Sequence, residues 1–393
     1  MSSHLTGNRK RALVLAPFFS TSMHANRPLS VARALSELAT VDVVTTDFDH
    51  STRKNQNAQI GSIERIVYLK TPTYYNNVSF SRLYSHLRFS IRAALYLRKQ
   101  RNRYDIVYVT LPFNIIAWYV LRNSSAKLKI VDVVDIWPDV LPFPPFVRVV
   151  LAPVFYIWKW FFKSSVIKAN LVMAVSDDFM GAASRYAKKD TKLYRFYIGH
   201  ELLASTVPKQ SIITIAYVGN LGRLYDFETL LDVLSEEELR SKVQVFIIGA
   251  GDRQDWLIGE LERRRIRYRF FGVIFDTGRL AEILRSCHLG FNGYYNTTAA
   301  FSYKANTYFA AGLPILNSMV GDLHRLVAEH ELGFNYLGGD RNSLKRCLTQ
   351  INESNLASMA QNCERFFTAQ IDSAKIRQHM VNRLREYTEL SNV

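Results

Sequence analysis

The feature that most constrains the fold is an alternation of short apolar runs with segments of helical periodicity. These runs lie at 41–46, 105–111 and 129–135 in the first half of the chain, and at 213–219, 243–249 and 289–294 in the second. Such runs, separated by helical patterns, are typical of buried parallel strands joined by crossover helices. The sequence therefore predicts an α/β fold that is built twice along the chain.

A break in composition separates the two halves. Polar and turn-forming residues fill 197–211, and of the 18 glycines only Gly7, Gly61 and Gly181 precede residue 199. A chain of 393 residues is long enough for two domains with separate cores. We expect a first domain at 1–200, a second at 201–372, and a last helix in 373–393.

Charge and cysteine content narrow the class of protein. The formal net charge is +16, which favours an anionic partner, and an apolar content of 48% excludes a disordered chain. Cys287, Cys347 and Cys363 form no pairing framework, as expected in a reducing cytoplasm. The apolar run near the N-terminus is only about eight residues long, ends in Pro17-Phe18-Phe19 and lacks the small-residue cleavage site of a signal peptide, so we interpret it as the first strand. No apolar stretch reaches the ~20 residues that a spanning helix needs.

Two glycine-rich turns follow predicted strands in the second half. The first, at 217–234, places Gly219, Asn220, Gly222 and Arg223 between a strand and an amphipathic helix, and the second, at 247–254, contains Gly249 and Gly251. Glycines at strand ends let backbone amides approach a ligand, and the following helix offers its positive end to an anion. Ordinary turn glycines are the alternative interpretation.

The segment 296–318 places a lysine at the start of a predicted helix. Lys304 follows a group of polar side chains, among them Thr298, Ser302 and Tyr303. A lysine beside a helix N-terminus is a suitable partner for a phosphate group. The alternative is a solvated lysine on a surface helix.

The order of these segments resembles the GT-B glycosyltransferases, and family 4 most of all. The resemblance rests on VGN-x-G, IIG-x-G, K-x-x-x-YFAAGLPIL and GDLHRLVAEHELGF in the second half, and on RALVLAPFF, VDVVDIWPD and ANLVMAVSDDF in the first. It implies two Rossmann-like domains facing across a cleft, with a nucleotide-diphosphate sugar bound by the second domain and the acceptor by the first. It also implies that the last helix packs back on the first domain, that anomeric configuration is retained, and that no metal or other cofactor is needed.

The resemblance assigns roles to single residues. Arg223 and Lys304 would stabilise the leaving diphosphate. Asp135 lies at the C-terminal end of a predicted strand, where catalytic side chains of open α/β sheets are usual, and is the candidate base, although Val134 stands where the family often has a histidine. The family's two glutamates correspond here to Ala299 and Thr307, so the ribose would be held differently, for instance by Thr307 or Asn306. The donor-binding set implied is Gly219, Asn220, Gly222, Gly249, Gly251, Thr298, Ser302, Tyr303 and Thr307.

The acceptor side is less marked in the sequence. His24, Asn26 and Arg27 follow the first predicted strand and are candidates to face the acceptor, with a structural role as the alternative. Asp47 and Asp49 form an Asp-x-Asp pair, which we interpret as a polar strand end because it lies away from the glycine-rich turns.

Two basic segments in the first half predict contact with an anionic membrane surface. Residues 76–104 contain no acidic residue, and Arg88, Arg92, Lys99 and Arg103 share one helical stripe; 140–176 mixes aromatic side chains with lysines. Taken together with the resemblance to GT-B glycosyltransferases, these segments lead us to expect a glycosyltransferase of the hexosyltransferase type that acts on a lipid-linked glycan in bacterial surface polysaccharide synthesis. We expect it to be peripheral to the inner face of the membrane and to have no nucleic-acid partner. A non-catalytic GT-B-like subunit and a sugar-nucleotide epimerase are the alternatives.

Overall fold

The chain divides into two compact units in the computed structural model. Unit 1 comprises Met1–Ile198 with Ile376–Val393, and unit 2 comprises Gly199–Lys375. The structure describes residues 9–21, 26–50, 52–75, 79–100, 103–139, 143–295 and 301–390.

The core of unit 1 is a parallel sheet of seven strands in the order β3-β2-β1-β4-β5-β6-β7. The central strands are apolar and buried on both faces, as crossover helices require. The strands are β1 (Arg11–Leu15), β2 (Thr40–Thr46), β3 (Arg65–Leu69), β4 (Ile106–Leu111), β5 (Leu128–Val133), β6 (Leu171–Ala174) and β7 (Lys192–Arg195).

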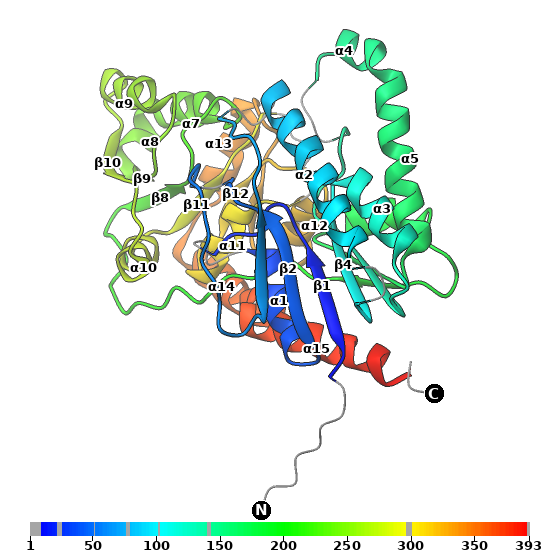
Figure 1. Ribbon diagram of the computed structural model, residues 1–393. Coiled ribbons are helices and arrows are strands. Elements are labelled where there is room, and N and C mark those ends of the chain that lie inside the picture. Colours follow the sequence, from blue (N-terminus) through cyan, green and yellow to red (C-terminus); the bar gives the residue numbers. More distant parts are fainter. Residues whose placement is uncertain are drawn as a thin grey trace, which may run out of the picture. The chain divides into compact units, whose positions relative to one another are not determined.

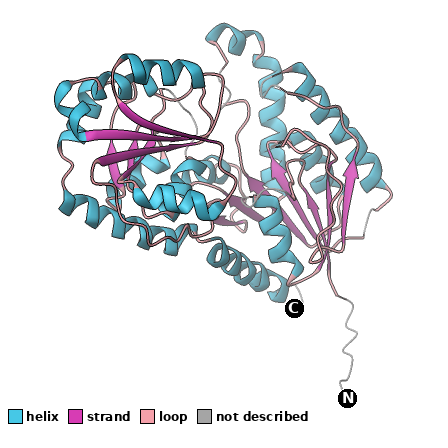
Figure 2. Ribbon diagram, turned by 90° about the vertical axis from the view of Figure 1, so that its left-hand side faces the viewer, coloured by secondary structure: helices cyan, strands magenta, loops and turns pink. Residues whose placement is uncertain are grey.

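Helices cover this sheet on both faces (Figure 2). Three of them, α2, α3 and α5, are neighbours, with α3 packed against the other two (Figure 1). The helices of unit 1 are α1 (Arg27–Ser36), α2 (Phe80–Arg98), α3 (Asn114–Asn123), α4 (Pro145–Val150), α5 (Ala152–Lys168), α6 (Asp177–Ser184) and α15 (Ser373–Leu390), the last of which begins at the end of unit 2.

Unit 2 repeats the plan with a parallel sheet of six strands in the order β10-β9-β8-β11-β12-β13. The strands are β8 (Ile213–Val218), β9 (Val243–Ile248), β10 (Arg267–Gly272), β11 (Leu289–Asn292), β12 (Ile315–Asn317) and β13 (Gly333–Asn335). The helices are α7 (Phe227–Leu234), α8 (Glu237–Lys242), α9 (Gln254–Arg263), α10 (Thr277–Ser286), α11 (Tyr303–Ala310), α12 (Asp322–Glu329), α13 (Arg341–Thr349), α14 (Glu353–Phe366) and the π-helical turn η1 (Phe367–Ile371).

Strand order reverses direction at the same place in both sheets. In unit 1 the chain runs outward from β1 to β3 and then returns to place β4 on the other side of β1, and in unit 2 β11 returns to β8 in the same way. In open parallel sheets, ligands bind beyond the carboxyl ends of the strands at such a switch point. The predicted α/β fold is confirmed, and the strand order points to one candidate site in each unit.

Helix α2 differs from its expected form. It ends at Arg98, with Lys99 as its C-cap, so Arg103 lies outside the helix and the predicted basic stripe does not extend that far. The exposed side of α2 is instead apolar, and it carries Phe80, Tyr84, Leu87, Ile91 and Leu95. This spacing of three and four residues places all five side chains on one helical face.

Candidate functional site

Lys304 lies in an aromatic cage at the switch point of unit 2. It is the second residue of α11, and its side chain is buried, with 9% of its surface exposed. The Nζ atom lies 3.6 Å from the ring centre of Tyr225, 4.2 Å from that of Tyr217 and 5.2 Å from that of Tyr294, and it donates a hydrogen bond of 3.1 Å to Tyr217 Oη. The aromatic faces favour an ammonium ion, whereas burial lowers the pKa of Lys304 well below its usual value.

An anion beside Lys304 would restore its charge. A buried amine without a counter-ion is held toward the neutral form, and a phosphate within a few ångströms favours the protonated form. Lys304 also contacts the first glycine turn, because a Cβ on Gly219 would lie 3.4 Å from Lys304 Cε. The structure therefore brings together two of the segments that the sequence singled out.

The two glycine turns pack against each other, which gives their glycines a structural role. A Cβ on Gly249, whose φ is +138°, would lie 1.8 Å from the carbonyl oxygen of Gly219, and one on Gly251 would lie 2.3 Å from that of Leu221. The amide of Gly219 donates to Ile248 O at 2.9 Å, and the amide of Gly249 donates to Gly272 O at 2.7 Å. These two amides are thus used within the fold, which corrects the expectation that the Gly219 amide is free for a ligand.

The other predicted residues of the first turn lie close by. The backbone carbonyl oxygen of Asn220 accepts a short hydrogen bond from Tyr217 Oη. A Cβ on Gly222 would lie 3.0 Å from the side-chain nitrogen Nδ2 of Asn220. The side chain of Arg223 is 87% exposed, and its Nε lies 3.9 Å from Asp252 Oδ2. The Arg223 side chain therefore extends into solvent beside the turn, and its ion pair with Asp252 is long and exposed.

Helix α11 holds the remaining predicted donor residues. Ser302 is its N-cap and lies 3.2 Å from Tyr294 Oη, so it supports the cage. Tyr303 stacks on His200 with ring centres 5.5 Å apart, and Thr307 Oγ1 lies 3.3 Å from His200 Nε2. Thr298 and Ala299 lie outside the described residues.

A row of three asparagines, which the sequence analysis missed, ends the adjacent strands β11, β12 and β13. Asn292, Asn317 and Asn335 are register partners, and hydrogen bonds of 2.8 Å join their side-chain amides in series. Nothing in the linear spacing connects these three residues. The signal in the sequence that could have identified them is the polar residue at the end of each apolar run, because a parallel sheet binds ligands at the carboxyl ends of its strands.

In unit 1, Arg27 and Asn26 have structural roles. Arg27 is buried and forms a bidentate ion pair with Asp132 at 2.6 and 2.8 Å, and its Nη1 donates to Phe196 O at 2.5 Å. Asn26 caps α1 by accepting from Leu29 N and donates to Phe18 O. These contacts correct the expectation that both side chains face an acceptor, because their polar atoms are engaged inside the unit. His24 lies outside the described residues.

Asp135 follows β5 at the carboxyl edge of the unit 1 sheet. Its carboxylate accepts hydrogen bonds from the amide of Ile136 at 3.0 Å and from Trp137 Nε1 at 2.8 Å. Burial raises the pKa of Asp135 above its usual value, although the bond from Trp137 opposes this rise. A partly desolvated carboxylate with spare lone pairs can accept a proton from a hydroxyl group.

The Asp-x-Asp pair is used in loop hydrogen bonds. Asp49 accepts from Ser20 Oγ at 2.5 Å, and Asp47 accepts from the amide of Thr71 at 2.9 Å. Both carboxylates thus order loops beyond the strands of unit 1. Within the described ranges, no three or more His, Cys, Asp or Glu side chains gather as metal ligands would.

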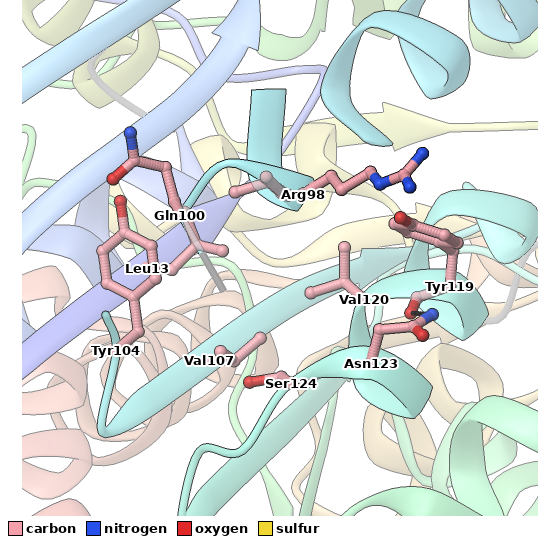
Figure 3. Close-up of a pocket in the computed structure, with 10 residues that line it drawn as sticks. Leu13, Arg98, Gln100, Tyr104, Val107, Tyr119, Val120, Asn123 and Ser124 are labelled. Atoms are coloured by element: carbon pink, nitrogen blue, oxygen red, sulfur yellow. Dashed lines mark hydrogen bonds between the residues drawn. The ribbon is translucent and has the colours of Figure 1, made fainter. Parts of the chain in front are cut away.

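A small cavity of about 160 Å³ lies at the opposite edge of this sheet (Figure 3). Its lining comes from the start of β4 and the C-terminal ends of α2 and α3, and includes Tyr104, Val107, Leu97 and Val120. Because ligands of open parallel sheets bind at the carboxyl edge, we do not place the reaction in this cavity.

Apolar side chains are exposed on α4 and α5 as well as on α2. They are Phe146, Val149 and Val150 on α4, and Val154, Tyr156, Ile157 and Trp160 on α5. The basic side chains Arg148, Lys159 and Lys163 lie on the same two helices. In the described part of the chain, no helix combines the length and the apolar character needed to cross a membrane.

Residues 213–353 match the family described as glycosyl transferases, group 1. No curated protein matches the chain by sequence. The match spans the aromatic cage, both glycine turns and the asparagine row. These residues therefore form a glycosyltransferase domain.

Solved structures resemble the whole chain. Sucrose-phosphate synthase from Thermosynechococcus elongatus superimposes with a TM-score of 0.71 at 17% identity, covering 97% of this chain and all of that one. The Anabaena protein HepE in complex with UDP-glucose gives 0.64 at 15%, covering 96% and 100%. WaaG, a glycosyltransferase involved in lipopolysaccharide biosynthesis, gives 0.65 at 13%, covering 95% and 98%. Together with the family match, these findings confirm a glycosyltransferase with the GT-B fold.

Proposed function

Since the chain carries a glycosyltransferase domain on a GT-B fold, we propose that it transfers a sugar from a nucleoside diphosphate to a lipid-linked glycan at an anionic membrane surface. The donor binds unit 2 at the Lys304 cage, and the acceptor binds unit 1 at the edge that carries Asp135. Retention of configuration, independence from metal ions, membership of family 4 and a role in bacterial surface polysaccharide synthesis belong to the same proposal.

The observation that carries the donor assignment is the placement of Lys304. Lys304 is a buried amine with no carboxylate partner in the described structure around it, and burying such a group lowers the stability of the fold. Groups of this kind are typical of functional sites, here a site for an anion. HepE, which has the same fold, was solved with UDP-glucose and with UDP, so the proposed ligand is of a kind that the fold holds elsewhere.

The proposed chemistry follows from the charges. The bond between the anomeric carbon and the diphosphate oxygen breaks, and its electron pair stays on the diphosphate. Lys304 and Arg223 stabilise this negative charge. The acceptor hydroxyl oxygen forms the new bond to the anomeric carbon, and its proton passes to the carboxylate of Asp135. Thr307, at the position of one of the usual glutamates, would contact the sugar or ribose, and His200, whose Nε2 lies 3.3 Å from Thr307 Oγ1, would support that contact.

The lipid-linked acceptor is supported by the exposed helices of unit 1. An apolar face with basic side chains beside it suits the headgroup region of an anionic bilayer. WaaG shows that the same fold occurs in lipopolysaccharide synthesis.

The experiment is a thermal-shift series with UDP, GDP, ADP, TDP and CMP, followed by a transfer assay on bacterial lipid extract with the nucleotide sugar that stabilises the protein. We expect stabilisation by one diphosphate, and donor consumption only when extract is present. Donor conversion without extract would indicate an epimerase. Nucleotide binding without any turnover would indicate a non-catalytic subunit, and either result would overturn the proposal.

A further inference from the structure

Aromatic and basic side chains gather at the carboxyl edge of the unit 1 sheet. They come from the segments that follow β1, β2, β3, β4 and β5 and from the first turns of α2. We call this set the edge cluster, and it consists of Phe18, His50, Tyr74, Arg82, His86, Phe113 and Trp137.

Arg82 and His86 lie one helical turn apart on α2 and therefore share a face. Both contact the same indole: the Arg82 guanidinium carbon lies 4.7 Å from the centre of the Trp137 ring, and the His86 ring stacks on it at 5.5 Å with 18° between the planes. Trp137 Nε1 in turn donates to Asp135. The cluster thus adjoins the carboxylate that we propose as the base.

Positive charge exceeds negative charge in and around the cluster. Arg82 shares a hydrogen bond with Tyr74, Tyr74 Oη lies 2.9 Å from His50 Nδ1, and Arg53 Nη1 lies 3.3 Å from the same nitrogen. Asp49 and Asp135 are the carboxylates that act on these groups, and both already accept hydrogen bonds from the protein. Two guanidinium groups and two imidazoles beside them form a setting suited to an anion.

One polar atom of the cluster has no partner in the described structure. The Nε2 atom of His86 is buried and makes no hydrogen bond, and only 7% of the residue is exposed. Buried polar groups in native proteins are almost always satisfied, and an unpaired one calls for a specific explanation. A ligand oxygen next to Arg82 would supply the missing partner.

We propose that the edge cluster binds a phosphate group beside the acceptor site, held by the Arg82 guanidinium and His86 Nε2. This inference rests on the proposed function and adds the chemical class that the acceptor presents beside Asp135. The phosphate belongs either to the lipid diphosphate of the acceptor or to a separate phosphate ion. The apolar outer face of α2, which begins at Phe80, favours the lipid source because the same helix would contact chain and headgroup.

The test measures binding of inorganic pyrophosphate and of geranyl diphosphate to the full chain by equilibrium dialysis. All samples carry Lys304→Met, which removes the cation of the donor site. Arg82→Gln and His86→Gln are compared with Arg88→Gln, which removes a charge from the same helix outside the cluster. Wild-type protein is assayed in parallel for nucleotide-induced stabilisation.

We expect Arg82→Gln to weaken pyrophosphate binding about tenfold or more, since charge-assisted bonds to phosphate are strong. His86→Gln should weaken it less, and Arg88→Gln should change it by less than about twofold. Tighter binding of geranyl diphosphate than of pyrophosphate would identify the lipid source, and equal binding would identify the free ion.

A second readout separates a binding role from a structural one. Pyrophosphate should shift the imidazole nitrogen resonances of His86 in the protein with Arg82 intact, and the same concentration should shift them much less in Arg82→Gln. Absence of pyrophosphate binding, or equal binding by Arg82→Gln, overturns the inference even if a nucleotide still stabilises the wild type. Failure of the proposed function would instead appear as loss of nucleotide stabilisation with Lys304 present.

Discussion

At the residue scale, Lys304 shows how a functional side chain can cost stability. Its ammonium group is buried among aromatic rings, and burial lowers the pKa of Lys304. Replacing a buried charge with an apolar side chain of similar volume is often neutral or stabilising. The same replacement removes the cation that would meet the diphosphate.

We therefore predict that Lys304→Met unfolds at the same or a higher temperature than the wild type, but binds the donor nucleotide about 10- to 100-fold more weakly, as expected for a charge-assisted bond worth about 1.5–3 kcal/mol. Calorimetric titration and thermal unfolding measure the two effects. Lys345→Met, on the surface beside Glu236, is the matched control and should leave nucleotide affinity unchanged. A destabilised Lys304→Met would contradict this account.

The buried His86 and the half-buried His50 give a prediction on pH. Burial, together with the charge of Arg82, lowers the pKa of His86 to about 3, and burial with Arg82 and Arg53 lowers that of His50 to about 4, where Asp49 opposes the shift. The unfolded chain binds protons at these sites near pH 6.5. Because the unfolded state then holds more protons than the folded state, stability falls as pH drops from about 6.5 toward 4.

We expect His86→Gln to lose less stability than the wild type between pH 7 and pH 5, by up to about 2 kcal/mol. Urea unfolding at the two pH values measures the difference. His379→Gln, at an exposed position of α15, is the control. An equal loss in wild type and His86→Gln would show that His86 binds a proton in the folded state.

At the scale of elements, the exposed helices of unit 1 carry a prediction on membranes. Tyr156→Glu with Ile157→Glu places two negative charges on the apolar face of α5. Binding to vesicles of anionic lipid should fall about tenfold or more, because apolar burial is lost and the new charges are repelled. Vesicle sedimentation measures this. Phe275→Glu, an exposed phenylalanine of unit 2, should bind like the wild type.

The edge strands show why some elements escaped sequence analysis. The six apolar runs named from the sequence all overlap strands, whereas β3, β7, β10 and β13, which end the two sheets, were not recognised. An edge strand lacks a neighbour on one side, so its residues are only partly buried and need not be apolar. Hydrophobic patterning reports burial, and burial is lowest at the edges.

At the scale of the whole molecule, the last helix returns to the first unit. From Ile376 onward α15 belongs to unit 1, with Met380, Val381 and Leu384 fully buried, and Tyr387 donates to Asn170 O. We predict that Leu384→Ala costs about 2–5 kcal/mol and increases hydrogen exchange in unit 1 but not in unit 2. Arg377→Gln, at an exposed position of the same helix, is the control, and loosening of unit 2 would refute the assignment.

The sequence by itself determined the α/β class, the division into two halves, the glycine turns and Lys304 at the start of a helix. Each of these depends on local spacing, which a linear pattern records. The tertiary structure alone decided that three tyrosines, Tyr217, Tyr225 and Tyr294, enclose Lys304. It also decided that Arg27 pairs with Asp132 inside unit 1, and that Trp137 contacts both Asp135 and Arg82 of α2. These contacts join residues far apart in the chain, and only the packing of strands and helices brings them within reach of each other.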